Sequence, residues 1–306
     1  MERILITGGA GFIPSSLANG LLDNIDCEVI LVDNMLTGDH KNIPKGLSCK
    51  FYTVDVNDFT EIQKIFLNYK FDYVFHYAAV VGVKRTIENP IMVLRDVDGI
   101  KNILELSVKN KVKKVFFSSS SEVYGEPVEL PMHEKTTPLN SRLPYAIVKN
   151  IGEAYFKSYN KEFGLFFSIF RFFNTYGVNQ SKDFVISKFL NSAIYNQDIT
   201  IYGDGKQNRT FCYIDDNIDV TLKILKNDLI NNQIINIGNE IIYTINDLAK
   251  IIVEILDSKS KIINVPALPE GDMTRRQPDI SKMKNILKRP LIDLREGLLK
   301  ILNEKQ

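Results

Sequence analysis

The sequence has few of the residues that build metal sites or disulfide frameworks. Its three cysteines, Cys27, Cys49 and Cys212, form no CxxC pair, and its three histidines stand singly at positions 40, 76 and 133. An odd number of cysteines without such spacing favours reduced thiols over a disulfide or zinc framework. We therefore expect no bound metal.

The sequence also lacks an excess of either charge and any long apolar run. Lys plus Arg number 38 against 37 Asp plus Glu, which gives no positive surplus to attract nucleic acid or an anionic membrane. No run reaches the roughly 18 apolar residues of a membrane span, and the N-terminal "MERILITGG" has no small-residue cleavage site. We expect a cytoplasmic protein without nucleic-acid or membrane partners.

Short runs of β-branched and aromatic residues alternate with amphipathic stretches through the first half of the chain. They are "RILIT", "EVILV", "CKFYTV", "YVFHYA", "KVFFSSS" and "LFFSIFRF". Residues 91–110 and 143–164 carry apolar residues at helical spacing, and Gly164 is suited to a C-cap. Such alternation predicts βαβ units and a parallel sheet.

The rhythm changes after about residue 174, where turn-rich segments such as "YGVNQSKD" and "YGDGKQN" begin. "IDDNIDVTLKILK" and "QIINIG" again indicate a helix and a strand that return to the first sheet. We expect an α/β protein with a Rossmann-type doubly wound parallel sheet and a smaller C-terminal α/β substrate domain. The expected boundaries are 1–174 plus about 214–240 for the first domain, and 175–213 plus about 241–306 for the second.

A glycine-rich loop follows the first predicted strand. In "ILITGGAGFI", Gly8 and Gly11 let the chain turn tightly and approach a pyrophosphate, while the following helix offers unpaired amides to the anion. Three glycines form a simple tight turn in many proteins, so the context decides. Asp33 ends the second strand 22 residues beyond Gly11, where an acid binds the adenosine ribose and repels a 2′-phosphate. This favours NAD over NADP.

Two further features bear on this loop. Asp55 follows the third strand and is suited to the adenine edge, whereas Asp58 is equally suited to a helix N-cap. Pro14 replaces the last glycine of the fingerprint, but it falls in the first helical turn, where the missing N–H has no intrahelical partner. Loss of cofactor binding therefore does not follow.

Tyr145 and Lys149 lie four residues apart in "YAIVK" and share one helix face. A lysine ammonium near a phenol favours its ionised form and makes Tyr145 a general base. Upstream, "FFSSSSEVYG" ends a strand in four hydroxyls, and the carboxyl end of such a strand faces the ligand crevice.

Taken together, TGGAGF, HYAA, SSSSEVYG, PYxxxK, RFFNTYG, YGDGKQNRTFCYIDD and RRQPDI span nearly the whole chain. In this order they resemble the extended short-chain dehydrogenase/reductase family that acts on nucleotide-diphosphate sugars as epimerases, dehydratases and decarboxylases. The resemblance implies catalytic roles for Tyr145, Lys149, Ser120 and Glu122. It implies that NAD is bound by Gly8, Gly11, Phe12, Ile13, Asp33, Asn34, Asp55, Val56, Ala78, Ala79 and Lys149. It implies that the substrate is bound by Asn174, Arg209 and one of Arg275 and Arg276, since guanidinium suits a diphosphate.

The sequence departs from the family's pattern at several positions. Dehydratases carry Asp then Glu after the hydroxyl, where this chain has Ser121 and Glu122, which disfavours 4,6-dehydration. The Ser-Glu pair is closer to the decarboxylases, which usually have threonine at the position of Ser120. The usual Asn-Val-x-Gly-Thr begins here with Asp96, whose carboxylate would stabilise positively charged NAD if it faced the cofactor.

The resemblance implies an NAD-dependent enzyme that oxidises C4 of a nucleotide sugar for surface-polysaccharide biosynthesis, as a 4-dehydrogenase or 4-epimerase. The alternatives are a decarboxylase of a nucleotide-linked uronic acid, a 4,6-dehydratase, or an NAD-sensing regulator, for which an intact catalytic set is not needed. The base stays open among GDP, UDP and dTDP; GDP-manno-heptose fits, but the motifs do not single it out. The expected assembly is a homodimer or tetramer.

Overall fold

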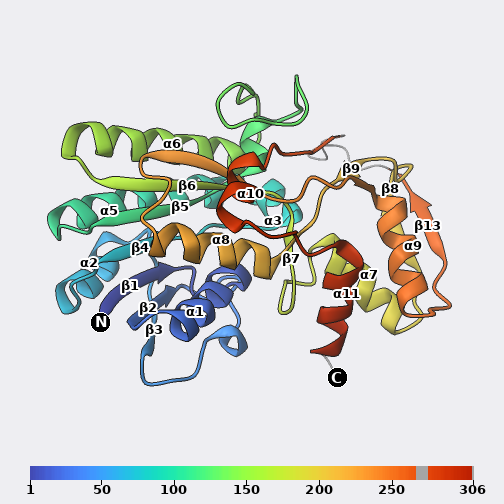
Figure 1. The fold of residues 1–306 in the computed structure, drawn as a ribbon, viewed down its shortest axis with the longest axis horizontal. Helices are drawn as coiled ribbons and strands as arrows, with labels where there is room; N and C mark the ends of the chain where they lie inside the picture. Colours follow the sequence, from blue (N-terminus) through green and yellow to red (C-terminus); the bar gives the residue numbers. More distant parts are fainter. Residues whose placement is uncertain (267–274, 305–306) are drawn as a thin grey trace. The chain divides into compact units, whose positions relative to one another are not determined.

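The computed structural model describes residues 1–266 and 275–304, and it divides into two compact units (Figure 1). Unit 1 comprises Met1–Val123, Ser141–Phe172 and Ile218–Ile235. Unit 2 comprises Tyr124–Asn140, Phe173–Asn217 and the described part of Asn236–Gln306.

Unit 1 is built on a seven-stranded sheet. Its strands are β1 (Glu2–Thr7), β2 (Cys27–Asp33), β3 (Cys49–Thr53), β4 (Tyr73–His76), β5 (Lys114–Ser120), β6 (Phe166–Phe172) and β11 (Gln233–Ile237). They lie in the order β11-β6-β5-β4-β1-β2-β3, and the neighbouring strands from β3 to β6 pair in parallel. The order reverses between β1 and β4, and ligands of such sheets bind beyond the carboxyl ends of the strands at this point.

Helices cover both faces of this sheet. They are α1 (Phe12–Asn24), α2 (Phe59–Asn68), α3 (Val83–Glu88), α4 (Pro90–Leu94), α5 (Asp96–Lys109), α6 (Pro144–Phe163) and α8 (Ile214–Lys226), whose first turn belongs to unit 2. Figure 1 shows α2, α5 and α6 over one face and α1 and α8 over the other. Gly20 of α1 lies against Ile218 and Leu222 of α8, where a Cβ would lie 2.6 Å from Ile218. The predicted doubly wound parallel sheet is therefore confirmed.

The predicted strands and most predicted helices are confirmed by the structure. β2 and β5 are buried along their whole length. The apolar run Val29–Val32 of β2 is typical of such a strand, whereas β5 begins with a lysine and ends in three serines. Gly164 adopts a left-handed φ of 71° and caps α6, as expected. The single helix expected over 91–110 is wrong in one respect: it is interrupted at Arg95, which separates α4 from α5.

Unit 2 contains short strands that pair two by two. Its elements are β7 (Thr175–Tyr176), α7 (Val185–Ile194), β8 (Ile199–Tyr202), β9 (Asn208–Arg209), β10 (Cys212–Tyr213), β12 (Tyr243–Thr244), α9 (Ile245–Ile255), β13 (Ile262–Val265), α10 (Ser281–Leu287) and α11 (Leu294–Asn303). The pairs are β10 with β7, β12 with β9, and β13 with β8. A capping box of Thr244 and Asp247 starts α9.

The observed units differ in their boundaries from the two domains expected from the sequence. Tyr124–Asn140 groups with unit 2, and unit 1 ends its last segment at Ile235 rather than near residue 240. Residues 267–274 and 305–306 of the expected second domain lie outside the described residues. The assignment of cofactor and substrate binding to the two domains stays a prediction.

Candidate active site

The glycine loop lies between β1 and α1, as the sequence predicts. Gly8 has a φ of 72°, and a Cβ on it would lie 2.9 Å from backbone atoms of Ala78. Gly11 is the N-cap of α1, donates its N–H to Gly8 O at 2.9 Å, and would place a Cβ 3.0 Å from the same oxygen. Side chains at these two positions would therefore fill the space in which the loop turns, and the amides of the first turn of α1 are left for an anion.

Proline at position 14 fits the first turn of α1. The helix begins at Phe12, so Pro14 is its third residue and its nitrogen needs no intrahelical acceptor. Pro14 is buried, while Phe12 and Ile13 are partly buried. The carbonyl of Phe12 accepts hydrogen bonds from the hydroxyls of Ser15 and Ser16, which anchor the turn.

Asp33 ends β2 and holds the glycine loop through its carboxylate. Its Oδ2 accepts a hydrogen bond from Ala10 N at 3.1 Å, and its Oδ1 accepts one from Met35 N at 2.8 Å. Burial raises the pKa of Asp33, and these two amide bonds oppose the shift. Asn34 accepts a hydrogen bond from Leu36 N and is exposed. The carboxylate is thus fixed between the loop and the strand end, where the sequence places the ribose contact.

Asp55 and Asp58 have separate local roles after β3. Asp58 accepts hydrogen bonds from the amides of Thr60 and Glu61 and is the N-cap of α2, the structural role weighed for it from the sequence. Asp55 is partly exposed, and its Oδ1 accepts the amide of Asn57 at 2.9 Å. Val56 is buried in the core beneath the loop.

Thr7 and His76 connect the ends of β1 and β4. The Thr7 hydroxyl oxygen accepts the amides of Tyr77 and Ala78 at 3.1 and 3.0 Å. Its hydrogen is then available to the Nδ1 atom of His76 at 2.9 Å. Burial and the charge of Lys149 lower the pKa of His76 to about 3, which keeps the ring neutral. His76 therefore supports the segment that contains Ala78 and Ala79.

Tyr145 and Lys149 occupy one face of α6, which begins at Pro144. The Lys149 ammonium lies 5.6 Å from the centre of the Tyr145 ring and donates a hydrogen bond to the Ser118 hydroxyl at 3.3 Å. Lys149 is only 3% exposed. Burial lowers its pKa to about 8, and the negative charge of Asp96 opposes that shift. Ser118 and Asp96 were not predicted as partners of this lysine, because their proximity depends on the packing of β5, α5 and α6.

Consecutive residues at the end of β5 have different roles. Ser120 is buried, and its Oγ accepts the amide of Glu122 at 3.1 Å, which leaves the hydroxyl hydrogen for another acceptor. Ser119 instead donates to Glu153 of α6 at 2.7 Å. Glu153 also forms a buried ion pair with Arg171 of β6, with distances of 2.8 and 2.7 Å. This network fixes α6 against the strand that carries Ser120.

Unit 2 places Asn174 and Arg209 on neighbouring segments. Asn174, at a φ of 29°, donates its side-chain amide to Thr210 O at 3.0 Å. Arg209 lies in β9, opposite Tyr243 of β12, and donates one hydrogen bond to Asn208 O at 2.8 Å. Thr210 follows Arg209 directly, so the two predicted substrate residues lie close together.

Arg275 and Arg276 differ in their surroundings. The side chain of Arg275 is 54% exposed and lies 3.8 Å from Glu126, whereas Arg276 is 8% exposed. A buried guanidinium needs polar or anionic partners, while an exposed one is solvated. The contrast favours Arg276 as the candidate for an anionic ligand.

Comparison with known proteins identifies the family. Residues 4–238 match the NAD dependent epimerase/dehydratase family. The chain belongs to this family. It is 37% identical to a candidate UDP-glucose 4-epimerase of Methanocaldococcus jannaschii, over 98% of this chain and 97% of that protein. It is also 37% identical to the UDP-N-acetyl-alpha-D-glucosaminuronate decarboxylase of Bacillus cytotoxicus, over 97% and 95% of the two chains.

A solved structure extends the likeness to the whole fold. The UDP-glucose 4-epimerase of Thermotoga maritima, determined with UDP-glucose, superposes with a TM-score of 0.91 and 32% identity, over 99% of this chain and 97% of that one. The protein is an NAD-dependent enzyme of the same family, and these three relatives modify nucleotide-linked sugars.

The residues at the strand ends of unit 1 fit NAD. The glycine positions have no room for a Cβ, the first turn of α1 contains no acidic residue, and the Asp33 carboxylate is anchored beside the loop. These features match a pyrophosphate at a helix N-terminus and a ribose at an acid. Within residues 1–266 and 275–304 there is no cluster of three or more side chains suited to a metal ion. No helix in the same ranges has the length and apolarity to cross a bilayer.

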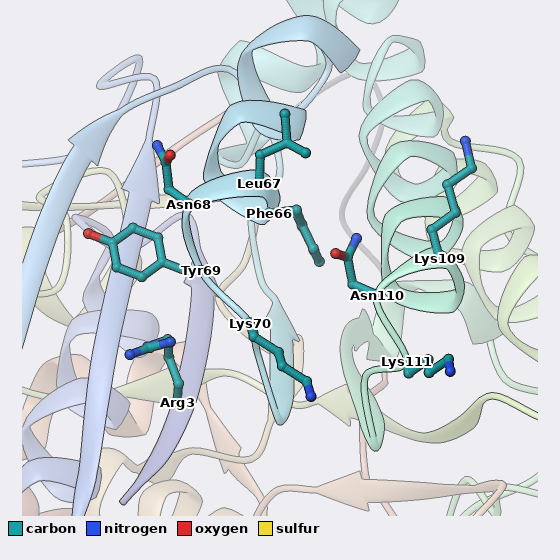
Figure 2. Close-up of a pocket in the computed structure, with 9 residues that line it drawn as sticks. All are labelled: Arg3, Phe66, Leu67, Asn68, Tyr69, Lys70, Lys109, Asn110 and Lys111. Carbon is teal, nitrogen blue, oxygen red and sulfur yellow. The ribbon is translucent and has the colours of Figure 1, made fainter.

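A separate pocket lies at the opposite end of the sheet. Figure 2 shows Arg3 of β1, Tyr69 and Lys70 after α2, and Lys109 at the end of α5 around it. Its arginine and one lysine already pair with carboxylates: Arg3 with Glu28 at 2.6 Å and Lys109 with Glu105 at 2.6 Å. Because Arg3 lies at the amino end of β1, away from the carboxyl ends of the strands, this pocket does not belong to the candidate active site.

Proposed function

We propose that the protein oxidises C4 of a nucleotide-diphosphate sugar, as a 4-epimerase or a 4-dehydrogenase. The observation that carries this proposal is the buried Lys149 ammonium 5.6 Å from the Tyr145 ring. A desolvated positive charge stabilises a phenolate, which is the form of Tyr145 that accepts a proton. The epimerase relatives in Methanocaldococcus jannaschii and Thermotoga maritima support the same chemistry.

In the proposed mechanism, Tyr145 removes the proton of the C4 hydroxyl while Lys149 keeps the phenolate stable. Ser120 donates its free hydroxyl hydrogen to the substrate oxygen and orients it, because its own oxygen already accepts the Glu122 amide. NAD, when bound, accepts the hydride that leaves C4. The product of this step is a 4-keto sugar. Return of the hydride to the other face gives the epimer, and release of the ketone gives a 4-dehydrogenase.

We assign the diphosphate of the substrate to Asn174, Arg209 and Arg276 of unit 2. Guanidinium groups bind phosphate oxygens in pairs, and both arginines are largely removed from water. The base of the nucleotide stays open among GDP, UDP and dTDP. A role in polysaccharide biosynthesis and a place in the cytoplasm stay predictions.

A decarboxylase is the second candidate function, and two observations favour it. The Bacillus cytotoxicus decarboxylase is as similar to this chain as the archaeal relative is. The pair Ser121 and Glu122 stands where dehydratases of the family have two acidic residues, and it is closer to the pair that the decarboxylases have. The two candidates share the oxidation at C4 and differ in the fate of the 4-keto sugar. Only a C5 carboxylate on the substrate permits loss of CO2.

The decisive experiment incubates the pure protein with NAD and a panel of UDP-, GDP- and dTDP-sugars, including UDP-glucose and UDP-glucuronate, and follows the products by NMR. Deuterium at sugar C4 should slow the reaction. It should remain on the nicotinamide ring if the 4-keto sugar is released, and it should return to C4 of the product if the sugar is epimerised. Tyr145→Phe should lower turnover about a hundredfold or more, the usual contribution of a general base. Tyr155→Phe, on the same helix, is the matched control.

Two results would contradict the proposal. Full activity of Tyr145→Phe would show that Tyr145 is not the general base. A product lighter by one water would indicate a dehydratase. If UDP-glucuronate were the only sugar of the panel converted, with release of CO2, the protein would be the decarboxylase.

We also propose a homodimer or tetramer. Ile147 and Ile151 are exposed one helical turn apart on α6, and Ile91 and Leu94 are exposed on α4, which packs against α6. Apolar side chains on an outer helix face are typical of subunit interfaces. Light scattering at micromolar concentration should exclude a monomer.

A further inference from the structure

Ser118 carries a buried hydroxyl that the proposed mechanism does not use. It lies in β5, two residues before Ser120, and is 8% exposed. Its Oγ accepts a hydrogen bond from the Lys149 ammonium at 3.3 Å. Within residues 1–266 and 275–304, this is the one hydrogen bond that the ammonium makes. A buried cation needs such a partner, because burial removes the water that would otherwise solvate it.

The hydroxyl of Ser118 has a second partner that fixes its orientation. A lysine ammonium can only donate, so the serine oxygen is the acceptor in the bond with Lys149. The serine hydrogen is donated to the backbone carbonyl of His76, with 3.4 Å between the two oxygens. A backbone carbonyl does not titrate, so this acceptor for the serine hydrogen is present at every pH. The lone pairs of Ser118 are therefore left for the lysine.

Close packing of α6 on β5 brings the lysine to this hydroxyl. A Cβ on Gly152, three residues after Lys149 on α6, would overlap the ring of Phe117 in β5. The Lys149 Nζ lies 5.0 Å from the centre of the same ring and 5.6 Å from the centre of the Tyr145 ring. The ammonium therefore lies near two aromatic rings, and Ser118 supplies its polar contact.

We propose that Ser118 is a positioning residue that holds the Lys149 ammonium beside Tyr145 and thereby sets how readily Tyr145 acts as a base. This inference rests on the proposed function, in which the phenolate of Tyr145 takes the proton of the C4 hydroxyl. The hydrogen bond stabilises Lys149 in its charged form and restricts the place of the charge. Without the hydroxyl, the buried ammonium loses its polar partner, deprotonates more readily and stabilises the phenolate less.

The other titratable groups around Lys149 leave this hydrogen bond to Ser118. They are Asp96 of α5, neutral His76 of β4, Tyr145 on α6 itself, and the paired Glu153 and Arg171 of α6 and β6. The negative charge of Asp96 favours the charged form of the lysine, but its Oδ2 accepts the amide of Val80 at 2.7 Å. Between these side chains and Lys149 the described part of the chain holds neither a hydrogen bond nor an ion pair. A substitution at Ser118 leaves all of them in place, so its effect can be measured separately.

Steady-state kinetics of three serine variants test the proposal, with NAD and the sugar of the panel that is converted. Ser118→Ala should lower kcat about tenfold, near the lower end of what one hydrogen bond to a charged group contributes, and should change KM for the sugar little. Ser118→Thr keeps a hydroxyl and should retain most of the activity. Ser168→Ala is the matched control, because this buried hydroxyl of β6 donates instead to the carbonyl of Ile230 at 2.8 Å, and kcat should be unchanged.

A titration of Tyr145 without substrate adds a second readout. The phenolate is followed by its ultraviolet absorbance, as the difference between each protein and the same protein with Tyr145→Phe. In Ser118→Ala the phenolate should form at a pH higher by about 0.5 or more than in the wild type, because the neighbouring positive charge is weakened. The acid limb of kcat should move in the same direction.

The outcomes separate the role of Ser118 from the proposed reaction. Full kcat and an unchanged titration in Ser118→Ala would overturn the proposal. Equal losses of kcat in Ser118→Ala and Ser168→Ala, with the titration unchanged, would indicate a purely structural role and would overturn it as well. If the wild type turns over none of the sugars but Ser118→Ala still moves the titration of Tyr145, the proposed reaction fails while the assignment of Ser118 stands.

Discussion

The ion pair of Glu153 and Arg171 is the most consequential buried charge pair next to the candidate active site. Glu153 accepts two hydrogen bonds from Arg171 and one from Ser119, and the two charged residues are 1% and 2% exposed. Replacing Glu153 with alanine removes the carboxylate that compensates a buried guanidinium. Breaking such a pair costs about 3–5 kcal/mol in the free energy of unfolding.

A double substitution separates the cost of leaving one buried charge unpaired from the net contribution of the ion pair to the free energy of unfolding. Glu153→Leu combined with Arg171→Met fills the space without charge, and replacements of this kind are often neutral or stabilising. We expect the double variant to lose far less stability than the two single variants together. Glu105→Ala disrupts the exposed pair with Lys109 and should change stability by about 0.5 kcal/mol or less.

Urea unfolding followed by circular dichroism measures these differences. A loss below about 1 kcal/mol in Glu153→Ala would refute the reasoning, because a buried guanidinium cannot lose a carboxylate at so small a cost unless the site admits water. Additive losses in the double variant would show that the two residues act independently.

Three further predictions concern the cofactor, the substrate and the buried lysine. Asp33 should make NAD bind at least tenfold more tightly than NADP, about 1.4 kcal/mol, and equal affinities by calorimetry would contradict its role at the ribose. Arg209→Ala and Arg276→Ala should each weaken binding of the active nucleotide sugar by about 1–3 kcal/mol without loss of NAD, whereas Arg275→Ala should have little effect; the reverse order would exchange the two adjacent arginines. Burial lowers the pKa of Lys149 from 10.5 in the unfolded chain to about 8 in the folded protein. Because the unfolded chain then binds the extra proton, the free energy of unfolding should rise as the pH increases from about 8 to 10.5. Lys149→Met should raise the free energy of unfolding of the cofactor-free protein at pH 7 by at most about 3 kcal/mol. If urea titrations showed that Lys149→Met raises the free energy of unfolding equally at pH 7 and pH 10, the lowered pKa of Lys149 would be excluded as the cause.

Local patterns predicted the parts of the site that depend on residues close in sequence. The glycine loop, the acid at the end of β2 and the Tyr145–Lys149 pair each lie within one strand, turn or helix, where spacing determines which side chains share a face. The proline at position 14 could also be judged locally, because its place in the first turn of α1 decides its effect.

The partners supplied by other elements could not be predicted. Ser118 lies 31 residues from Lys149, and Val80 lies 16 residues from Asp96, so neither spacing carries a periodic signal. The break at Arg95 could not be predicted either, because the apolar pattern continues through it. Asp96 was visible as a departure from the family's pattern, but its effect on Lys149 needed the fold.

The charges around α6 indicate why this part of the chain tolerates so many buried ionisable groups. The proposed mechanism needs a charged Lys149 beside Tyr145, yet burial alone would favour the neutral form of the lysine. Asp96 offsets that burial from α5, and one turn further along α6 Glu153 is itself offset by Arg171 from β6. Each of these two charges on α6 is thus compensated by a neighbouring element rather than by solvent, so the spacing of α5, α6 and β6 influences the ionisation of Lys149. Substitutions that shift these elements without touching Tyr145 should therefore alter the pH dependence of the reaction before they alter the fold.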